Sequence, residues 1–265
     1  MSHAPGGQWS DLAPRLMSGA VAAAVGLWVM WIGGLTFNLL IAVVSGIILW
    51  ELLRMIGVNR SAVPIAAASA LALLVAAALP GGYALPLLLA PAMLGVGLVG
   101  KYRFTYAIFS AVIMVAGFGL TVLRDDFGFG WMAWLVLVVI ATDILGYFAG
   151  RLIGGPKFWP KISPKKTWSG TVAGWIGAAI IGAVFVWQDQ SNGELIAISV
   201  AISMASQLGD VAESAVKRRM GVKDSSAIMP GHGGMFDRFD GMLGASIFLL
   251  LVERVIDFPP APVPI

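Results

Sequence analysis

The sequence predicts an all-α polytopic membrane protein with about nine transmembrane helices, and three observations lead to this class. Apolar residues make up 58% of the 265 residues and charged residues only 12%, whereas soluble domains are about half apolar and about a quarter charged. Apolar windows recur along the chain, and the length of each is close to the roughly 20 residues that a helix needs to cross a bilayer. The lysines and arginines gather between alternate windows.

The expected helices follow the apolar windows in order. The first two windows are divided at Gly33-Gly34, because paired glycines interrupt a helical run. Residues 1–14 lack the features of a secretory signal peptide, so we expect the first window to be a retained helix. The windows are residues 16–33, 35–52, 62–80, 82–100, 104–123, 128–149, 171–187, 194–214 and 241–258.

The basic residues predict how these helices are oriented. With nine spans, every Lys and Arg except Arg124 and Arg254 falls on one side of the membrane. The positive-inside rule assigns that side to the cytosol, together with the N-terminus and both long basic loops. The Ala- and Gly-rich composition favours a bacterial protein, and hence the inner (cytoplasmic) membrane of a bacterial cell.

The chain divides into an N-terminal half and a more polar C-terminal half. We expect residues 1–125 to form five transmembrane helices, and residues 126–265 to form a catalytic transmembrane region with two basic cytosolic loops, 151–170 and 215–240. No loop is long enough to form a soluble domain, so an active site must be built from helix ends and the two basic loops. The absence of cysteine excludes disulfides and thiolate metal sites. Residues 95–100 match GxGxxG, but they lie in an apolar window without a preceding strand, which favours helix packing over dinucleotide binding.

The first polar region is at the end of the sixth window, where Asp143 and Tyr147 share a helix face. An acid inside a membrane helix marks a functional site by default. A structural alternative stays open, in which Asp143 pairs with Arg151.

The second polar region is the loop 151–170, in which prolines stiffen a lysine-rich backbone. The lysines suited to binding phosphate groups are Lys157, Lys161, Lys165 and Lys166. The particular order of residues 163–168, from Ser163 through Thr167 to Trp168, favours a functional loop. The alternative is a generic basic loop that touches anionic lipid headgroups, where each charge contributes about 1 kcal/mol.

The third polar region joins the eighth and ninth windows. Asp210, Glu213, Ser214 and Lys217 are spaced to share one helix face, and Asp237 and Asp240 repeat the i, i+3 spacing. Carboxylates at two helix ends predict Mg²⁺ sites, because Mg²⁺ binds a few carboxylates together with substrate phosphates. The nearby cations would neutralise phosphate charge, and the combination favours phosphoryl or nucleotidyl transfer to a lipid. Structural ion pairs remain the alternative.

Residues 214–240, SAVKRRMGVKDSSAIMPGHGGMFDRFD, closely resemble the signature of the phosphatidate cytidylyltransferases, also called CDP-diglyceride synthases. Ser-x-x-Lys-Arg, Lys-Asp, Pro-Gly-His-Gly-Gly and Asp-Arg-x-Asp occur at matching spacing. The resemblance covers roughly the C-terminal half, and the first five windows match only in hydropathy. It also includes residues 163–168, Gly209-Asp210 with Glu213, and Asp143, Tyr147 and Gly150. Two departures are Met229 in place of Leu or Ile, and Ser169 in place of Glu.

The resemblance implies an enzyme that transfers CMP from CTP to phosphatidic acid, giving CDP-diacylglycerol and pyrophosphate. It implies Mg²⁺ at Asp210 and Asp237, and the i, i+3 spacing adds Asp240 as a third expected metal-binding residue. Two divalent sites are expected, and a monovalent cation is compatible. The residues expected in catalysis are Lys217, Arg218, Lys223, Asp224, His232 and Arg238. Those expected to bind substrate are Asp143, Tyr147, Ser163, Lys165, Lys166, Thr167, Glu213, Ser214, Gly233 and Gly234.

Two alternative functions compete with this one. A cytidylyltransferase for another lipid phosphate would have the same headgroup site, so only substrate assays separate the two. A transporter would carry polar residues at several mid-membrane positions, whereas we take Asp143 to be the main acid away from the basic loops. The expected partners are CTP, phosphatidic acid and the lipid bilayer, with no nucleic acid. The glycines at 146, 150 and 154 allow close packing within one chain or in a homodimer.

Overall fold

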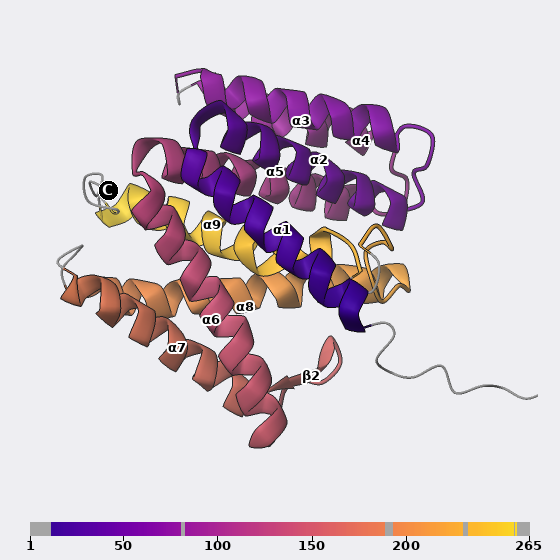
Figure 1. Ribbon diagram of the computed structural model, residues 1–265. Helices are drawn as coiled ribbons and strands as arrows, with labels where there is room; N and C mark the ends of the chain where they lie inside the picture. The colour runs from indigo at the N-terminus through magenta and orange to yellow at the C-terminus, as the bar shows by residue number, and fades with distance from the viewer. Residues whose placement is uncertain (1–11, 81–82, 189–192, 230–232, 257, 259–265) are drawn as a thin grey trace, which may run out of the picture.

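The fold, seen in a computed structural model, is a helical bundle with one small hairpin (Figure 1). The structure describes residues 12–80, 83–188, 193–229, 233–256 and 258. The helices are α1 (Leu12–Ile32), α2 (Gly34–Met55), α3 (Ala62–Ala78), α4 (Ala84–Val96), α5 (Arg103–Asp126), α6 (Phe129–Leu152), α7 (Trp168–Trp187), α8 (Glu194–Met220) and α9 (Phe236–Ile256). The strands are β1 (Lys157–Trp159) and β2 (Ser163–Thr167).

The helical class is confirmed, and each apolar window overlaps one of these helices, although most of the helices extend beyond their windows by a few residues. Within the described ranges, α2, α5, α6, α7 and α8 are long and apolar enough to cross a membrane. The expected helix over 82–100 was too long, because α4 ends at Val96 just before Gly97. Glycine costs about 1 kcal/mol in a helix, which favours an end in this glycine-rich stretch.

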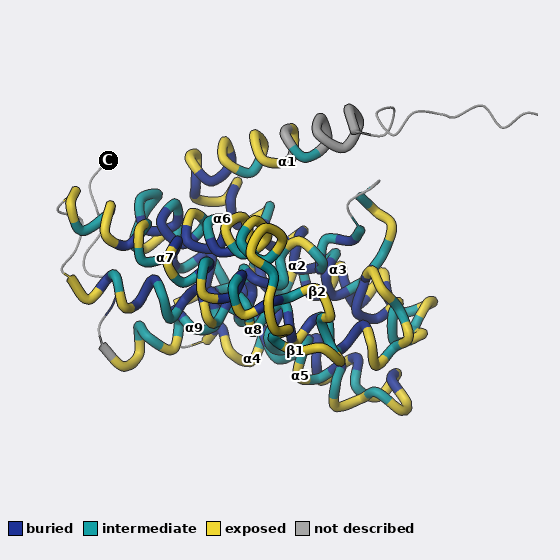
Figure 2. Tube along the Cα trace, turned by 90° about the horizontal axis from the view of Figure 1, so that it is seen from below, coloured by how far each residue is buried: buried dark blue, intermediate teal, exposed yellow. Residues whose placement is uncertain are grey.

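The helices pack in two groups, which α9 connects. Helices α2, α3, α4 and α5 pack together in one group, and α6, α7 and α8 in the other, with α9 packed on both α8 and α5 (Figure 1). Helix α1 contacts mainly α2 and lies outside this bundle, as Figure 2 shows. Trp28 and Trp31 on α1 are largely exposed, as expected for a helix that faces lipid.

The break between α1 and α2 is held by an arginine from α5. Gly33 has a φ of 71°, in the left-handed region that favours glycine. The Arg124 side chain donates hydrogen bonds to the carbonyl oxygens of Met30 (2.6 Å) and Trp31 (2.7 Å). Arg124 therefore satisfies carbonyl groups that the end of α1 leaves without helical partners.

Both basic loops lie at the same end of the bundle (Figure 1). The hairpin β1–β2 connects α6 to α7, and the described residues 221–229 and 233–235, here called the strap, lie between α8 and α9. The hairpin is antiparallel, pairing Lys157 with Thr167 and Trp159 with Ser163. The Thr167 side chain accepts a hydrogen bond from the Gly170 N–H (3.2 Å) and so caps α7.

Helices α8 and α9 approach closely because glycines face each other at their crossing. A Cβ atom on Gly209 would overlap the carbonyl oxygen of Asp240, and one on Gly244 would overlap that of Ala205. Since the next residue after Gly209 is Asp210, this crossing places the acids of the two helices side by side.

Candidate active site

A cavity of about 520 Å³ opens between the hairpin and helices α6, α7 and α8. Its volume lies within the range of about 300–1,000 Å³ that is usual for small-molecule sites. We call it the hairpin cavity. Its lining residues are Thr142, Asp143, Gly146, Tyr147, Gly150, Arg151, Phe158, Lys165, Lys166, Thr167, Gly170, Thr171, Gln207 and Asp210. Six of the residues expected from the sequence thus meet in one space: Asp143, Tyr147, Lys165, Lys166, Thr167 and Asp210.

An ion pair joins the hairpin to α8 across this cavity. The Lys166 ammonium lies 2.5 Å from Asp210 Oδ2 and donates a hydrogen bond to the Gln207 carbonyl oxygen (3.4 Å). The Ser214 hydroxyl donates to the other oxygen of Asp210 (3.3 Å). The lysine of the loop and the acid of the helix therefore belong to one site, which neither motif alone could show.

Asp143 does not pair with Arg151, contrary to the structural alternative considered above. Arg151 donates a hydrogen bond to the hydroxyl of Tyr147 instead (2.9 Å). Asp143 interacts electrostatically with Asp210, Lys166 and Arg238. Its carboxyl group is therefore part of the hairpin cavity.

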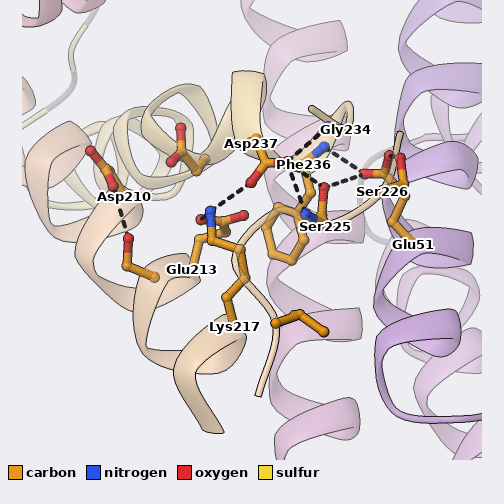
Figure 3. Close-up of polar contacts among 12 residues, drawn as sticks. Glu51, Asp210, Glu213, Lys217, Ser225, Ser226, Gly234, Phe236 and Asp237 are labelled. Atoms are coloured by element: carbon orange, nitrogen blue, oxygen red, sulfur yellow. Dashed lines mark hydrogen bonds and ion pairs between the residues drawn. The ribbon is translucent and has the colours of Figure 1, made fainter. Parts of the chain in front are cut away.

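A second polar cluster lies beside the cavity, where the end of α8 meets the start of α9 (Figure 3). The Lys217 ammonium lies 2.5 Å from Glu213 Oε2 and 2.5 Å from Asp237 Oδ1. The three side chains are only 11%, 1% and 10% exposed, respectively. One buried lysine thus joins an acid on its own helix to an acid on the next.

Asp237 is surrounded by hydrogen-bond donors from the strap. Its Oδ2 accepts hydrogen bonds from the Ser225 N–H (2.9 Å), the Ser225 hydroxyl (2.9 Å) and the Gly234 N–H (2.8 Å). Burial by itself would raise the pKa of this carboxyl group. The hydrogen bonds from Lys217, Gly234 and Ser225 outweigh burial and lower the pKa to about 2.

A carboxyl group that sequence reasoning missed, Glu51 on α2, also contacts the strap. Glu51 is fully buried, and its oxygens accept hydrogen bonds from the strap and from the start of α9. The view that Asp143 is the main acid away from the basic loops was therefore wrong. An acid inside an apolar window was the available signal.

The other expected residues lie around these two clusters. Arg218 is exposed and donates a hydrogen bond to the Val222 carbonyl oxygen (3.2 Å), which closes the end of α8. Lys223, Asp224 and Arg238 are exposed. Ser163 lies at the start of β2 and does not line the hairpin cavity. His232 lies outside the described residues.

The strap glycines are needed for close contacts with the two acids. Gly233 has a φ of 81°, and a Cβ there would press on Asp237 Oδ2. A Cβ on Gly234 would overlap the Ser225 hydroxyl and Glu51 Oε1. The close approach to Asp237, Ser225 and Glu51 thus requires glycine at both positions, whether or not either glycine also contacts the substrate.

Within the described part of the chain, no three His, Cys, Asp or Glu side chains converge as a ready metal site. The acids are nevertheless close to one another, because Asp240 interacts electrostatically with Asp210 and Asp143. Oxygen donors of this kind suit a hard cation such as Mg²⁺. Lysines contact two of the expected metal-binding acids, Asp210 and Asp237.

Comparisons with known proteins decide the family. The profile of the Cytidylyltransferase family matches residues 13–256. The chain belongs to this family. It is 33% identical to a phosphatidate cytidylyltransferase of Brucella suis over 96% of this chain and 97% of that protein. It is 32% identical to the Bacillus subtilis enzyme of that name, over 90% and 96% of the two chains, and 36% identical to that of Staphylococcus saprophyticus, over 86% and 94%.

The chain is thus similar to its relatives over nearly its whole length, and the resemblance is not confined to its C-terminal half. The departure at Ser169 has a structural counterpart. The Ser169 hydroxyl donates a hydrogen bond to the Gly154 carbonyl oxygen (2.5 Å) and lies 3.0 Å from the Thr167 hydroxyl. Ser169 therefore connects the start of α7 to the segment that follows α6, and a carboxylate is not required for that contact.

Proposed function

We propose that the protein is a CTP:phosphatidate cytidylyltransferase that makes CDP-diacylglycerol and pyrophosphate. The observation that carries this proposal is the hairpin cavity, in which Lys165 and Lys166 of the hairpin face Asp143 and Asp210 of two membrane helices. The position of this cavity at an end of the bundle suits one water-soluble and one lipid substrate. The relatives named above carry the same activity in their names.

In the proposed reaction, an oxygen of the phosphatidate phosphate attacks the α-phosphorus of CTP. A new P–O bond forms, the bond to the β-phosphate oxygen breaks, and pyrophosphate leaves with that electron pair. A phosphate monoester is already nucleophilic near neutral pH, so the chain need not supply a strong base. Positioning and charge stabilisation then account for most of the catalysis.

We assign phosphate binding and charge stabilisation to different residues of the site. Lys165, Lys166 and Arg151 at the cavity would bind phosphate oxygens, since ammonium and guanidinium groups offset the charge that develops on them. Lys217 and Arg238, at the facing ends of α8 and α9, would act on the same charge from the strap side. Further substrate contacts are proposed for Tyr147, Ser163, Thr167, Glu213, Ser214, Gly233 and Gly234, and further catalytic contacts for Arg218, Lys223, Asp224 and His232.

We propose that Asp210, Asp237 and Asp240 hold the Mg²⁺ that accompanies CTP. Their oxygen donors fit this ion, and α8 and α9 bring them to the same crossing. Bound there, Mg²⁺ would supply positive charge to the phosphates. Lys166 and Lys217 contact Asp210 and Asp237, so these ammonium groups would turn toward phosphate when substrate binds.

One assay tests the reaction. Purified protein with CTP, Mg²⁺ and phosphatidate should form CDP-diacylglycerol, measured by chromatography of the lipid product. Asp210→Asn and Asp237→Asn should each lower kcat by about 100-fold or more, as expected for groups that stabilise developing charge. Asp126→Asn, an exposed acid at the opposite end of α5, is the matched control. No product with phosphatidate would refute the substrate, and product from a different lipid phosphate would identify the alternative cytidylyltransferase.

We also propose nine membrane spans, a cytosolic N-terminus, and a place in the bacterial inner membrane. The arrangement of the two basic loops at one end of the bundle supports this orientation (Figure 1). Because the chain has no cysteine, single cysteines report orientation without a background. A membrane-impermeant thiol reagent added to intact spheroplasts should label Asp126→Cys and spare Lys161→Cys. The reverse pattern would refute the orientation.

A further inference from the structure

Glu51 accepts hydrogen bonds from two segments that lie far from it in sequence. Its Oε1 accepts from the Ser226 hydroxyl (2.5 Å) and the Met235 N–H (2.9 Å). Its Oε2 accepts from the Ser225 hydroxyl (3.2 Å) and the Phe236 N–H (2.7 Å). A fully buried side chain with a donor for each of four acceptor positions is a built site, and here the strap is what occupies it (Figure 3).

Two of these donors belong to the start of α9. The first N–H groups of a helix have no partners within the helix, and a carboxyl group near them is favoured by the helix dipole. Met235 immediately precedes α9, and Phe236 is its first residue. Glu51 on α2 therefore caps α9 from a different helix.

The same contacts connect Glu51 to Asp237. The Ser225 hydroxyl lies 3.2 Å from Glu51 Oε2 and 2.9 Å from Asp237 Oδ2. Two successive backbone N–H groups also bind different acids: that of Gly234 donates to Asp237, and that of Met235 donates to Glu51. A displacement of Glu51 would move the donors that orient Asp237.

The apolar side of this turn is fixed as well. Phe236 is 1% exposed and packs edge-to-face on Phe109 of α5, with ring centroids 6.2 Å apart. The turn is thus fixed on one side by packing and on the other by Glu51. Of these two contacts, only the one made by Glu51 can be weakened by a substitution that hardly changes the volume of the side chain.

We infer that Glu51 is a positioning residue for the transfer reaction: it fixes the strap and the first turn of α9 so that Asp237 faces Lys217. This role rests on the proposed function above. It also gives the N-terminal half of the chain a part in the active site, because Glu51 is contributed by α2.

Glu51→Gln tests this role with little change in side-chain size. An amide keeps one acceptor oxygen but places an NH₂ group against at least one donor, so the turn should loosen. We expect kcat to fall by about 10- to 100-fold, since small misplacements of a reacting group cost about that much. The KM for CTP should rise by a smaller factor than kcat falls, because the proposed phosphate-binding lysines of the hairpin are untouched. Glu51→Ala, which removes both oxygens, should lose more kcat than Glu51→Gln.

Hydrogen–deuterium exchange provides a readout that does not depend on activity. Backbone amides of residues 233–237 should exchange about tenfold faster in Glu51→Gln and in Ser226→Ala, because a local contact that protects them is lost. Asn38→Ala is the matched control. It removes a hydrogen bond from the same helix, to Asp125 (2.8 Å), but at the opposite end, so exchange at 233–237 and kcat should both match the parent protein.

Two results would overturn the role. The first is a folded Glu51→Gln with kcat within about twofold of the parent protein, because a misplaced Asp237 should cost more than that. The second is unchanged exchange at residues 233–237 in both Glu51→Gln and Ser226→Ala. Should Glu51→Gln fail to fold, Ser226→Ala decides by the same two measurements. Should the parent protein make no CDP-diacylglycerol, the proposed function fails, and exchange alone decides whether Glu51 holds the strap.

Discussion

Replacing Lys217 by methionine should strongly destabilise the protein, because one ammonium group serves two buried acids. The Lys217 nitrogen lies 2.5 Å from both Glu213 and Asp237, and the three side chains are 11%, 1% and 10% exposed. Removing one partner of a buried ion pair costs about 3–5 kcal/mol, since the remaining charge is left uncompensated. Lys217→Met leaves the charge of Asp237 uncompensated and Glu213 without its partner, so we expect a loss of at least about 3 kcal/mol.

The cause can be separated from loss of packing by a second substitution. Asp237→Asn in the Lys217→Met background removes the unpaired charge, and it should recover about 2 kcal/mol of the loss. The assay is reversible unfolding in mixed micelles with increasing SDS, followed by tryptophan fluorescence. Lys223→Met, at an exposed lysine of the strap, is the control and should change stability by less than about 0.5 kcal/mol. A Lys217→Met protein as stable as this control would refute the reasoning, and so would a double variant less stable than Lys217→Met.

Three further predictions follow from particular contacts. Gly244→Val should prevent α8 and α9 from closing, because its side chain would meet the Ala205 carbonyl oxygen; both folding yield and activity should fall, and normal activity would contradict the crossing. The Asp237 pKa of about 2 lies below the usual value, so its stabilisation is complete above about pH 4 and lost as pH falls toward 2; Asp237→Asn should flatten acid unfolding in that window, and an unchanged acid midpoint would contradict the assignment. Arg124→Ala should speed proteolysis near the α1–α2 break without lowering kcat, because it frees only the carbonyls of α1; equal proteolysis would show that the contact is dispensable.

Hydropathy was enough to place the helices, because a lipid-facing helix must be apolar over its whole length. It could not place the end of α4, since Gly97 and Gly100 are tolerated in an apolar window but weaken a helix there. It also gave no sign of the β1–β2 hairpin. The prolines indicated a stiff loop, and the pairing of Lys157 with Thr167 depends on contacts across that loop.

The site was predicted as separate pieces, and their assembly was not. Lys166 and Asp210 were both expected to be functional, but the ion pair between them depends on how the hairpin folds over α8. Glu51 was missed for a different reason. Two of its partners are backbone N–H groups at residues 235 and 236, and backbone donors leave no trace in the side-chain pattern. Only the unusual position of an acid in α2 pointed to it.

The two lysine–carboxylate contacts explain how this site can hold several acids at the end of a membrane bundle. Buried charges are costly unless they are paired, and Lys166 and Lys217 each pair with an acid that belongs to the proposed cation site. Incoming phosphates would compete for the same two ammonium groups. Each ammonium group drawn to phosphate would leave a carboxylate, Asp210 or Asp237, open to the cation that neutralises the triphosphate. Nucleotide and cation binding should therefore reinforce each other, because either one alone would leave one side of these ion pairs without a partner.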